Sequence, residues 1–257
     1  MESILGIDVS KWQSAIDWKK VKQSGIKFAM IRASYGNGQD SYFLSNVEGA
    51  QKVGIETGAY HYCYAKTVYE AIKEAEFFLS VIKGAKITYP VVLDLEDKSL
   101  AGLDSSTLTA IALAFLDTID SNGYYAMLYI NLNWMNTKLN MDKLKKYAIW
   151  LADWTKTLGD VKNKIGIWQY TDKGKVDGIT GAVDCDESFY DYSSIIQKAG
   201  LNHLKKGDFM EEEKEISLQE AIQIVQSKAD LEQRTIDFLM DYKFSDVLIK
   251  KLAVAMK

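Results

Sequence analysis

The sequence contains few of the residues that build disulfide frameworks, zinc sites and histidine-based active sites. It holds two cysteines, two histidines and one proline among 257 residues. Cys63 and Cys185 are far apart and form no Cys-x-x-Cys pair, so we expect them to be reduced and structural. With only His61 and His203 available, a catalytic metal centre of histidines is not expected, and we predict no metal and no cofactor.

Long apolar runs and export signals are also missing. No run approaches the ~18 apolar residues of a membrane span. The acidic start, residues 1–6, lacks the basic and apolar regions of a secretory signal. The net charge of −4 does not favour non-specific nucleic-acid binding. Neither Gly-x-Ser-x-Gly nor Gly-x-x-x-x-Gly-Lys-Ser/Thr occurs. We therefore expect no membrane span, no nucleic-acid partner and no unaided export.

The most informative segment is residues 89–97, an apolar run that ends in carboxylates. Such a run indicates a strand buried on both faces, as in a parallel sheet. Because side chains alternate along a strand, we expect Asp94 and Glu96 on one face at its C-terminal end. Burial and a neighbouring like charge both raise the pKa of a carboxyl. One of the two can then stay protonated near neutral pH as a proton donor while the other stays ionised.

Strands and helices alternate in the first half of the chain. Strands are predicted at residues 5–10, 28–33, 57–64, 91–96 and 126–131, and helices at 17–24, 42–53, 68–82 and 105–123. This repeat of roughly 25–35 residues matches one βα unit. Three further strands, at 147–154, 165–170 and 183–190, follow without full helices between them. The sequence thus predicts an α/β fold, a TIM-like (β/α)5(β)3 barrel.

Acidic and aromatic residues are predicted together at the mouth of this barrel, where TIM-barrel chemistry takes place. The acids are Asp8, Asp94, Glu96 and Asp184, from the first, fourth and eighth strands. The candidate binding residues include Tyr35, Tyr60, Tyr62, Tyr129, Trp150 and Trp168. This combination suits a sugar polymer, because aromatic rings stack on pyranose faces and carboxylates act on the glycosidic bond. Some of these aromatics must instead fill the barrel.

An ordered series of motifs covers about residues 4–195. The motifs are Gly6-Ile7-Asp8-Val9-Ser10 with Trp12-Gln13, and segments 28–34, 58–62, 92–96, 150–154, 168–170 and 183–184. The series resembles glycoside hydrolase family 25, muramidases that cut the β-1,4 bond between N-acetylmuramic acid and N-acetylglucosamine in peptidoglycan. The resemblance implies that Glu96 is the acid/base and Asp94 its essential partner, with Asp8 and Asp184 completing the acidic cluster.

The roles of several residues stay open at this point. Asp94 could be a nucleophile or could orient the substrate's own 2-acetamido group, and we favour the second because the substrate of the family carries that group. Asp8 and Asp184 could support catalysis or pair structurally. Arg32 could be their counter-ion or could bind a peptidoglycan carboxylate. His61 is expected to pack rather than to catalyse.

Two other functions compete with a muramidase. A chitinase-like glycosidase also uses an Asp-x-Glu pair, but its motif carries a further Asp where this chain has Val92. A non-catalytic carbohydrate-binding barrel is disfavoured by the intact acidic set. A phage endolysin fits the missing signal, and the scarcity of arginine fits a low-GC Gram-positive host. It would stay in the host cytoplasm until a membrane pore gives it access to the cell wall.

The composition changes after the predicted catalytic barrel, residues 1–200. A charged linker at 201–215 leads to a helical domain at 216–257, with three helices at 218–228, 231–242 and 246–256. The core of so small a domain is marginal alone. We expect it either to bind a host cell-wall component or to form a homo-oligomer or a complex with its own C-terminal fragment. Met210 follows Lys205-Lys206-Gly207-Asp208, whose purine-rich codons could act as a ribosome-binding site, and is a candidate internal start.

Overall fold

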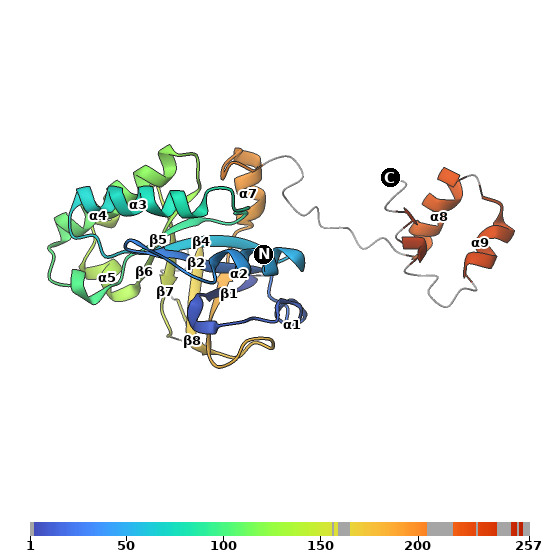
Figure 1. The fold of residues 1–257 in the computed structure, drawn as a ribbon, viewed down its shortest axis with the longest axis horizontal. Coiled ribbons are helices and arrows are strands. Elements are labelled where there is room, and N and C mark those ends of the chain that lie inside the picture. The colour runs from blue at the N-terminus through green and yellow to red at the C-terminus, as the bar shows by residue number, and fades with distance from the viewer. Residues whose placement is uncertain are drawn as a thin grey trace. The chain divides into compact units, whose positions relative to one another are not determined.

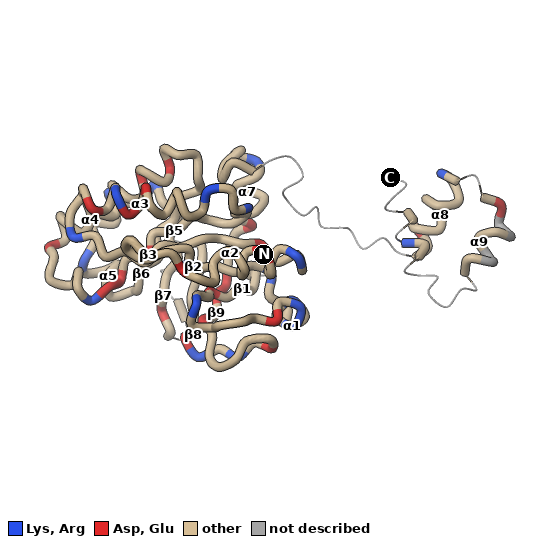
Figure 2. The backbone as a smooth tube through the Cα atoms, viewed as in Figure 1, with Lys and Arg blue, Asp and Glu red and all other residues tan. Residues whose placement is uncertain are grey.

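The computed structural model describes residues 3–155, 157–158, 165–204, 218–229, 231–240, 248–250 and 252–253. The chain divides into two compact units, Met1–Phe209 and Met210–Lys257. In the first unit, helices surround a central group of strands (Figure 1). Acidic and basic residues are interspersed along its backbone (Figure 2). No helix within the described residues is long and apolar enough to cross a membrane.

Eight strands of the first unit close a barrel. In spatial order they are β1 (Ile4–Val9), β2 (Phe28–Tyr35), β4 (Glu56–Tyr62), β5 (Val91–Asp94), β6 (Ala126–Asn131), β7 (Ala148–Ala152), β8 (Ile167–Gly174) and β9 (Val183–Ser188), which returns to β1. Neighbours from β1 to β8 are parallel, whereas β9 is antiparallel to both β8 and β1. A short strand, β3 (Gly38–Gln39), pairs with the end of β2.

Helices cover the outside of the barrel. They are α1 (Trp18–Gln23), α2 (Phe43–Lys52), α3 (Val68–Ile82), α4 (Ser105–Ser121), α5 (Leu132–Thr137), α6 (Met141–Leu144) and α7 (Tyr192–Ala199), with 3-10 turns η1 (Lys11–Gln13) and η2 (Lys98–Leu100). Helix α3 has the bounds expected from the sequence, because Thr67 and Glu70 form a capping box at its start. Its buried residues Ala71, Ala75 and Phe78 lie at helical spacing on one face.

The core has two layers that follow the alternation of side chains along the strands. Leu93 and Leu95 belong to the layer between strands and helices, whereas Val92 belongs to a second cluster inside the barrel. Asp94 alternates with Leu93 and therefore faces the interior of the barrel. The apolar run before Asp94 thus determines which way this carboxylate points.

The structure corrects two details of the predicted strands. The strand expected at residues 91–96 ends at Asp94, so Glu96 lies in the following segment. The last strand, expected at residues 183–190, ends at Ser188, and it runs antiparallel to both neighbours with Asp184 near its start. The physical reason is the short connection at 175–182, because a parallel strand needs a crossover of about a dozen residues or more.

The barrel unit continues past residue 200, where we predicted the linker to begin. The side chain of Asn202 is buried and accepts a hydrogen bond from Tyr125 N at 2.8 Å. Its Nδ2 donates to the carbonyls of Ile87 and Tyr89 at 2.9 Å each. These backbone groups precede β5 and β6, so Asn202 attaches the end of the unit to the floor of the barrel.

The second unit contains α8 (Leu218–Ala229) and α9 (Gln233–Met240), close to two of the predicted helices. Residues 248–250 and 252–253 are helical, and the rest of the third predicted helix lies outside the described residues. Ala221, Val225 and Ile236 form a small apolar cluster with Ile249 and Ala253. The three-helix domain as a whole stays a prediction. Met210 and most of the predicted linker also lie outside the described residues.

Candidate active site

A pocket of about 190 Å³ opens at the mouth of the barrel. Four carboxylates line it: Asp8, Asp94, Glu96 and Asp184. Aromatic, amide and other side chains complete the lining, namely Trp12, Tyr60, Tyr62, Tyr129, Trp150, Gln13, Gln169, Arg32, Ser10 and Val9. The antiparallel strand β9 starts at the mouth, which explains why Asp184 joins acids from the ends of parallel strands.

Asp94 and Glu96 differ in how far they are withdrawn from water. Asp94 is 5% exposed at the end of β5, whereas Glu96 is more accessible in the following segment. Burial and the charge of Glu96 raise the pKa of Asp94 well above its usual value, and Arg32 opposes this shift. Burial, followed by Asp184 and Asp97, raises the pKa of Glu96. In both residues these shifts favour the protonated form relative to a free carboxyl group.

Asp8 and Asp184 face each other across β1 and β9, where they are register partners. Burial and the charges of Asp186 and Asp184 raise the pKa of Asp8 well above its usual value. The side-chain amide of Gln169 donates to Asp8 Oδ2 at 2.7 Å, which favours its ionised form. Burial and Asp172 raise the pKa of Asp184 to about 6. The cluster can therefore exchange protons close to neutral pH.

Two residues of this site were missed in the sequence. Asp186 is 0% exposed and accepts a hydrogen bond from Trp150 Nε1 at 2.8 Å. Its alternation with Asp184 along β9 repeats the spacing of Asp94 and Glu96, and could have indicated a second inward-facing pair. Gln169 accepts from Tyr129 OH at 3.1 Å while it donates to Asp8. No spacing rule in the sequence distinguishes such a glutamine.

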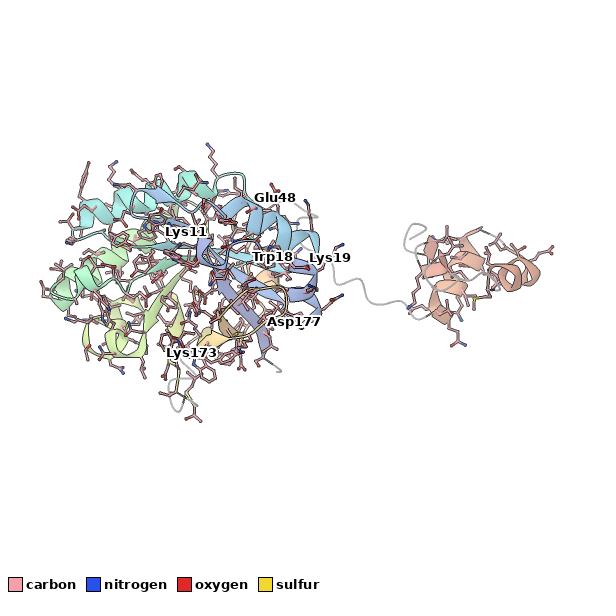
Figure 3. All side chains as sticks on the ribbon, turned by 60° about the horizontal axis from the view of Figure 1, so that its bottom comes forward. Lys11, Trp18, Lys19, Glu48, Lys173 and Asp177 are labelled. Atoms are coloured by element: carbon pink, nitrogen blue, oxygen red, sulfur yellow. The ribbon has the colours of Figure 1, made fainter. Side chains whose placement is uncertain are left out.

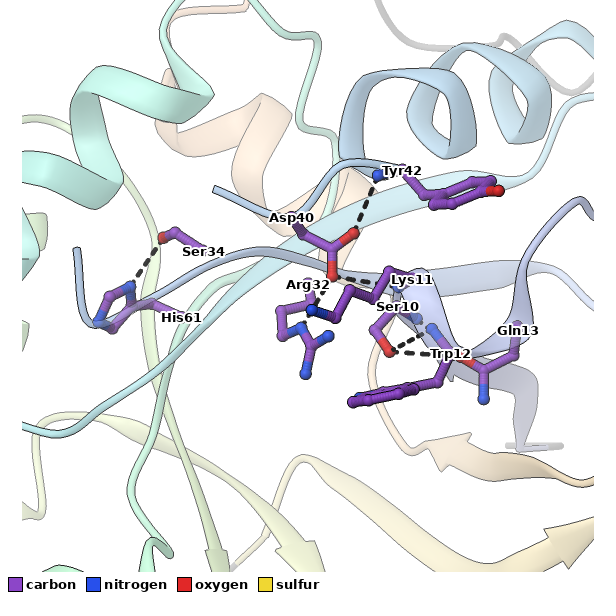
Figure 4. Close-up of polar contacts among 9 residues, drawn as sticks. All are labelled: Ser10, Lys11, Trp12, Gln13, Arg32, Ser34, Asp40, Tyr42 and His61. Atoms are coloured by element: carbon purple, nitrogen blue, oxygen red, sulfur yellow. Dashed lines mark hydrogen bonds and ion pairs between the residues drawn. The ribbon is translucent and has the colours of Figure 1, made fainter. Parts of the chain in front are cut away.

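Arg32 also lines the pocket, and its ion-pair partner is Asp40. Its Nε donates to Asp40 Oδ2 at 2.9 Å (Figure 4), whereas no ion pair joins it to Asp8 or Asp184. Asp40 is 1% exposed and also accepts from the backbone N–H groups of Lys11 and Tyr42. These contacts attach the start of η1 to β2, because one carboxylate bridges both elements.

The aromatic residues that line the pocket form its floor, its wall and an exposed ring at its edge. Tyr60, Tyr129 and Trp150 line the pocket, but they are at most 8% exposed and pack against one another as its floor. Tyr62 lines the wall and remains partly exposed. Trp12, which is 74% exposed on η1, offers the largest free aromatic surface of the pocket. A sugar ring can therefore stack on Trp12 or Tyr62 more readily than on the floor.

Trp168 and Tyr35 do not line the pocket. Trp168 alternates with the inward-facing Ile167 and Gln169, so it points out of the barrel and donates to Asp153 O at 2.7 Å. Tyr35 follows an irregularity in the β2–β4 register between Arg32 and Ser34. The Tyr35 ring lies 5.1 Å from Lys11 Nζ. Arg32 Cζ lies 5.4 Å from the same ring, so Tyr35 packs against residues beside the pocket without lining it.

His61 packs in the core, as expected. It is 0% exposed, and its ring lies between Phe78 and Phe115. Nδ1 lies 2.7 Å from Ser34 Oγ (Figure 4), and Nε2 lies 2.8 Å from Glu74 Oε2. Burial lowers the pKa of His61. Among the described residues, no group of three or more His, Cys, Asp and Glu side chains has the geometry of a metal site, and this includes the surroundings of His61.

Comparison with known proteins places this site in a family. The profile of glycosyl hydrolases family 25 matches residues 7–179. The autolytic lysozyme of Clostridium acetobutylicum is 28% identical over 183 residues, which cover 71% of this chain and 55% of the relative. Lysozyme M1 of Streptomyces globisporus is 30% identical over 196 residues, covering 70% and 66% respectively. The chain therefore spans from about half to two thirds of the length of these relatives.

A solved structure agrees with the profile. The crystal structure of the CTP1L endolysin superposes with a TM-score of 0.67 and 30% identity, covering 77% of this chain and 70% of that one. The matched region includes Asp8, Asp94 and Glu96, and the pocket that they line with Asp184 lies at the mouth of the shared barrel. Because the profile covers more than half of the sequence, the chain belongs to glycosyl hydrolases family 25.

Proposed function

We propose that this chain is a muramidase, which hydrolyses the β-1,4 bond between N-acetylmuramic acid and N-acetylglucosamine in peptidoglycan. The observation that carries the proposal is the convergence of Glu96 and Asp94 with two further carboxylates in one aromatic-lined pocket. Family membership and relatives named as lysozymes support the same activity. The pocket supplies a proton donor, a charged partner and rings for sugar stacking, which are the parts that glycoside hydrolysis needs.

Glu96 is the general acid in this proposal. The oxygen that leaves the sugar must be protonated as the glycosidic bond breaks, and the donor must be protonated beforehand. Burial and the charges of Asp184 and Asp97 raise the pKa of Glu96 toward the working pH. Glu96 also follows the end of β5, where its side chain reaches a substrate that enters from the mouth. The same carboxylate then removes a proton from the attacking water.

Asp94 stabilises the positive charge that develops on the sugar. In the arrangement that we favour, the 2-acetamido oxygen of the substrate attacks the anomeric carbon, and Asp94 orients the acetamido N–H. One oxygen of Asp94, Oδ1, is buried without a hydrogen-bond partner. Such a group is costly to bury alone. An acetamido N–H from the substrate would satisfy it, as acetamido assistance requires.

Asp8 and Asp184 support the reaction through their charge. Asp184 raises the pKa of both Glu96 and Asp8. Gln169 orients Asp8 and also holds Tyr129 of the floor. The two aspartates thus set the protonation of the cluster, whereas Glu96 and Asp94 contact the reacting atoms.

The biological role that we propose is host lysis by a phage endolysin, acting on a low-GC Gram-positive host. The protein would wait in the host cytoplasm and reach the wall through a pore made by a separate protein. The helices of the second unit would then bind a wall component or associate with other copies. The similarity to the CTP1L endolysin supports this role.

An internal start at Met210 belongs to the same proposal. The activity of the CTP1L endolysin is regulated by a secondary translation product, which gives a precedent in a similar protein. Here the purine-rich codons expected before Met210 would yield a free copy of the second unit. Intact mass spectrometry of the expressed gene should show a species that begins at Met210, and Met210→Leu should remove it. A single full-length species would contradict this part of the proposal.

Reducing-end analysis of digested peptidoglycan tests the activity. A muramidase releases fragments that end in N-acetylmuramic acid, whereas cleavage of the other glycosidic bond releases ends of N-acetylglucosamine. A purely carbohydrate-binding barrel releases neither. New muramic acid ends that are absent with Glu96→Gln would support the proposal. Glucosamine ends, or no new ends, would overturn it.

A further inference from the structure

A second pocket lies beside the proposed active site. It is open, has a volume of about 480 Å³, and is lined by residues after β4, by α3, and by Asn37 and Ser99 of neighbouring turns. Tyr64 lines this pocket, and its ring centroid lies 5.3 Å from that of Tyr62, which lines the first pocket. The two tyrosines therefore form a continuous aromatic surface between the pockets.

Two tyrosines of this second pocket have large solvent-exposed fractions. Tyr64 is 44% exposed and Tyr69 is 69% exposed. Tyr64 is held from behind by Gly36, where a Cβ atom would lie 3.1 Å from its ring. Gly36 has a φ of 47°, in the left-handed region that favours glycine, so the turn that supports Tyr64 is specific. Exposed, supported rings of this kind suit a ligand with flat apolar faces.

The carboxylates of the second pocket are already occupied. Glu70 Oε2 accepts from the backbone of Lys66 at 2.7 Å and of Thr67 at 3.1 Å. Glu74 Oε2 is buried and bonds to His61 and to the backbone N–H of Tyr64. Both acids therefore accept hydrogen bonds from the protein itself, while their negative charges remain beside the lysines.

The lysines of this pocket are available by contrast. Lys66 forms no ion pair within 4.0 Å among the described residues, but its charge helps to lower the pKa of Asp97 nearby. Lys73 pairs with Glu76, but both side chains are 53% exposed, and such surface pairs are weak. The pocket thus presents two lysines, whose side chains can contact a ligand, next to two exposed rings and two carboxylates that are hydrogen-bonded to the protein. An anionic ligand can replace the surface pair of Lys73 at little cost.

We propose that the second pocket binds the carboxylate-bearing stem peptide of peptidoglycan while the glycan occupies the first pocket. The inference rests on the proposed function and extends it to the form of the substrate. Without phosphate polymers, the negative charges of peptidoglycan lie on its peptides, which branch sideways from alternate sugars. Lys66 and Lys73 lie to the side of the cleft, beyond Tyr62 and Tyr64, where such a branch would arrive.

The test compares peptidoglycan with and without its stem peptides. Both samples are first freed of phosphate polymers, and one is then treated with an amidase that removes the peptides. The test variant is Lys66→Gln/Lys73→Gln. The matched control is Lys83→Gln/Lys198→Gln, which removes the same charge from exposed positions that do not line either pocket. Cleavage is followed as kcat and KM from new reducing ends.

The test variant should raise KM for peptide-bearing glycan by about threefold to tenfold, as expected for two exposed charge pairs. Its kcat, and its KM for stripped glycan, should equal those of the wild type and the control. Added salt should reduce the difference. An unchanged KM on peptide-bearing glycan would overturn the inference, as would an equal rise on both substrates.

A binding measurement separates this inference from the proposed activity. Muramyl dipeptide, a muramic acid unit whose short peptide carries one carboxylate, is titrated into the full chain by NMR or calorimetry. We expect binding that weakens in the test variant but not in the control. If the wild type cleaves no glycan yet binds this probe through Lys66 and Lys73, the proposed function fails and the inference stands. Binding that is identical in all proteins overturns the inference.

Discussion

Trp150 donates its indole N–H to Asp186 Oδ1 at 2.8 Å, inside the barrel and in the same acidic cluster as Asp8. The other oxygen of Asp186, Oδ2, is buried without a partner. Burial and the charge of Asp184 raise the pKa of Asp186 well above its usual value. Asp186 thus holds Trp150 in the pocket floor, although burial makes ionisation of its carboxyl group unfavourable.

Asp186→Asn should stabilise the protein at neutral and alkaline pH. Because the folded-state pKa of Asp186 is raised, its contribution to stability is full below the unfolded-state pKa and is lost as pH rises through the folded-state value. Asparagine keeps an acceptor for Trp150 and cannot ionise. We expect the free energy of unfolding to rise by about 1–3 kcal/mol at about pH 8 and by less at about pH 4. Chemical denaturation at several pH values measures this.

Glu187→Gln is the matched control for this stability prediction, because it lies on the same strand but alternates to the other side. Its stability should follow the wild type across the pH range. If Asp186→Asn were no more stable than the wild type at alkaline pH, the carboxyl group would not be costly to bury, and this account of the cluster would be wrong.

Glu96→Gln should abolish most of the cleavage without unfolding the barrel. The amide keeps the shape of the side chain but cannot donate the proton, so we expect a loss of about 10²–10⁴-fold in kcat. Release of reducing ends from purified walls measures it, and circular dichroism checks the fold. Glu187→Gln serves again as control, because it removes a carboxylate that does not line the pocket. Near-wild-type lysis by Glu96→Gln would exclude it as the acid.

Asp94→Asn should also lose activity by orders of magnitude, and its chemistry can be distinguished from direct attack. If the acetamido group of the substrate is the nucleophile, a substrate with a 2-fluoro group in its place should form no covalent adduct with the enzyme. Intact mass spectrometry after incubation detects such an adduct. A glycosyl adduct that maps to Asp94 would contradict acetamido assistance and establish Asp94 as the nucleophile.

Asp184→Asn should move the alkaline limb of the activity profile to lower pH. Asp184 is one of the charges that raise the pKa of Glu96, so its removal lowers that pKa and the acid deprotonates earlier as pH rises. The profile of kcat/KM against pH reports the shift. Asp177→Asn is the control, since Asp177 lies exposed on the connection before β9 (Figure 3). An unchanged alkaline limb in Asp184→Asn would rule out this coupling.

Removal of residues 205–257 should weaken binding to host cells more than it weakens cleavage of solubilised glycan. This truncation keeps Asn202, which caps the backbone before β5 and β6. A second truncation after Gly200 removes those hydrogen bonds and should cost about 1–3 kcal/mol of stability. Cell sedimentation and denaturation measure the two effects. Equal retention on cells with and without residues 205–257 would argue against a targeting role.

The sequence was sufficient to predict most of the barrel for physical reasons that are local. The apolar run of β5 determines that Asp94 faces inward, and the capping box of α3 determines where that helix starts. The antiparallel direction of β9 was not predicted, because strand direction depends on the length of a connection rather than on the strand itself. Tyr35 does not line the pocket, because its ring packs against Lys11 and Arg32.

Buried polar partners were the least predictable part of the site. Gln169 and Asp40 act through hydrogen bonds to residues distant in sequence, for example Asp8 and Lys11. Such pairs depend on which strands become neighbours after the barrel closes. Asp186 is the exception, since its alternation with Asp184 was visible in the sequence before any fold was known.

The reversed direction of β9 determines where the chain leaves the barrel. A parallel final strand would end at the mouth, and the following segment would have to cross the entrance used by the glycan. Here β9 runs from the mouth of the barrel to its floor, and the chain continues from the floor into α7. The hydrogen bonds of Asn202 hold this end of the unit at the floor, opposite the mouth. In evolution, different C-terminal modules can be exchanged at this exit by recombination without rebuilding the entrance.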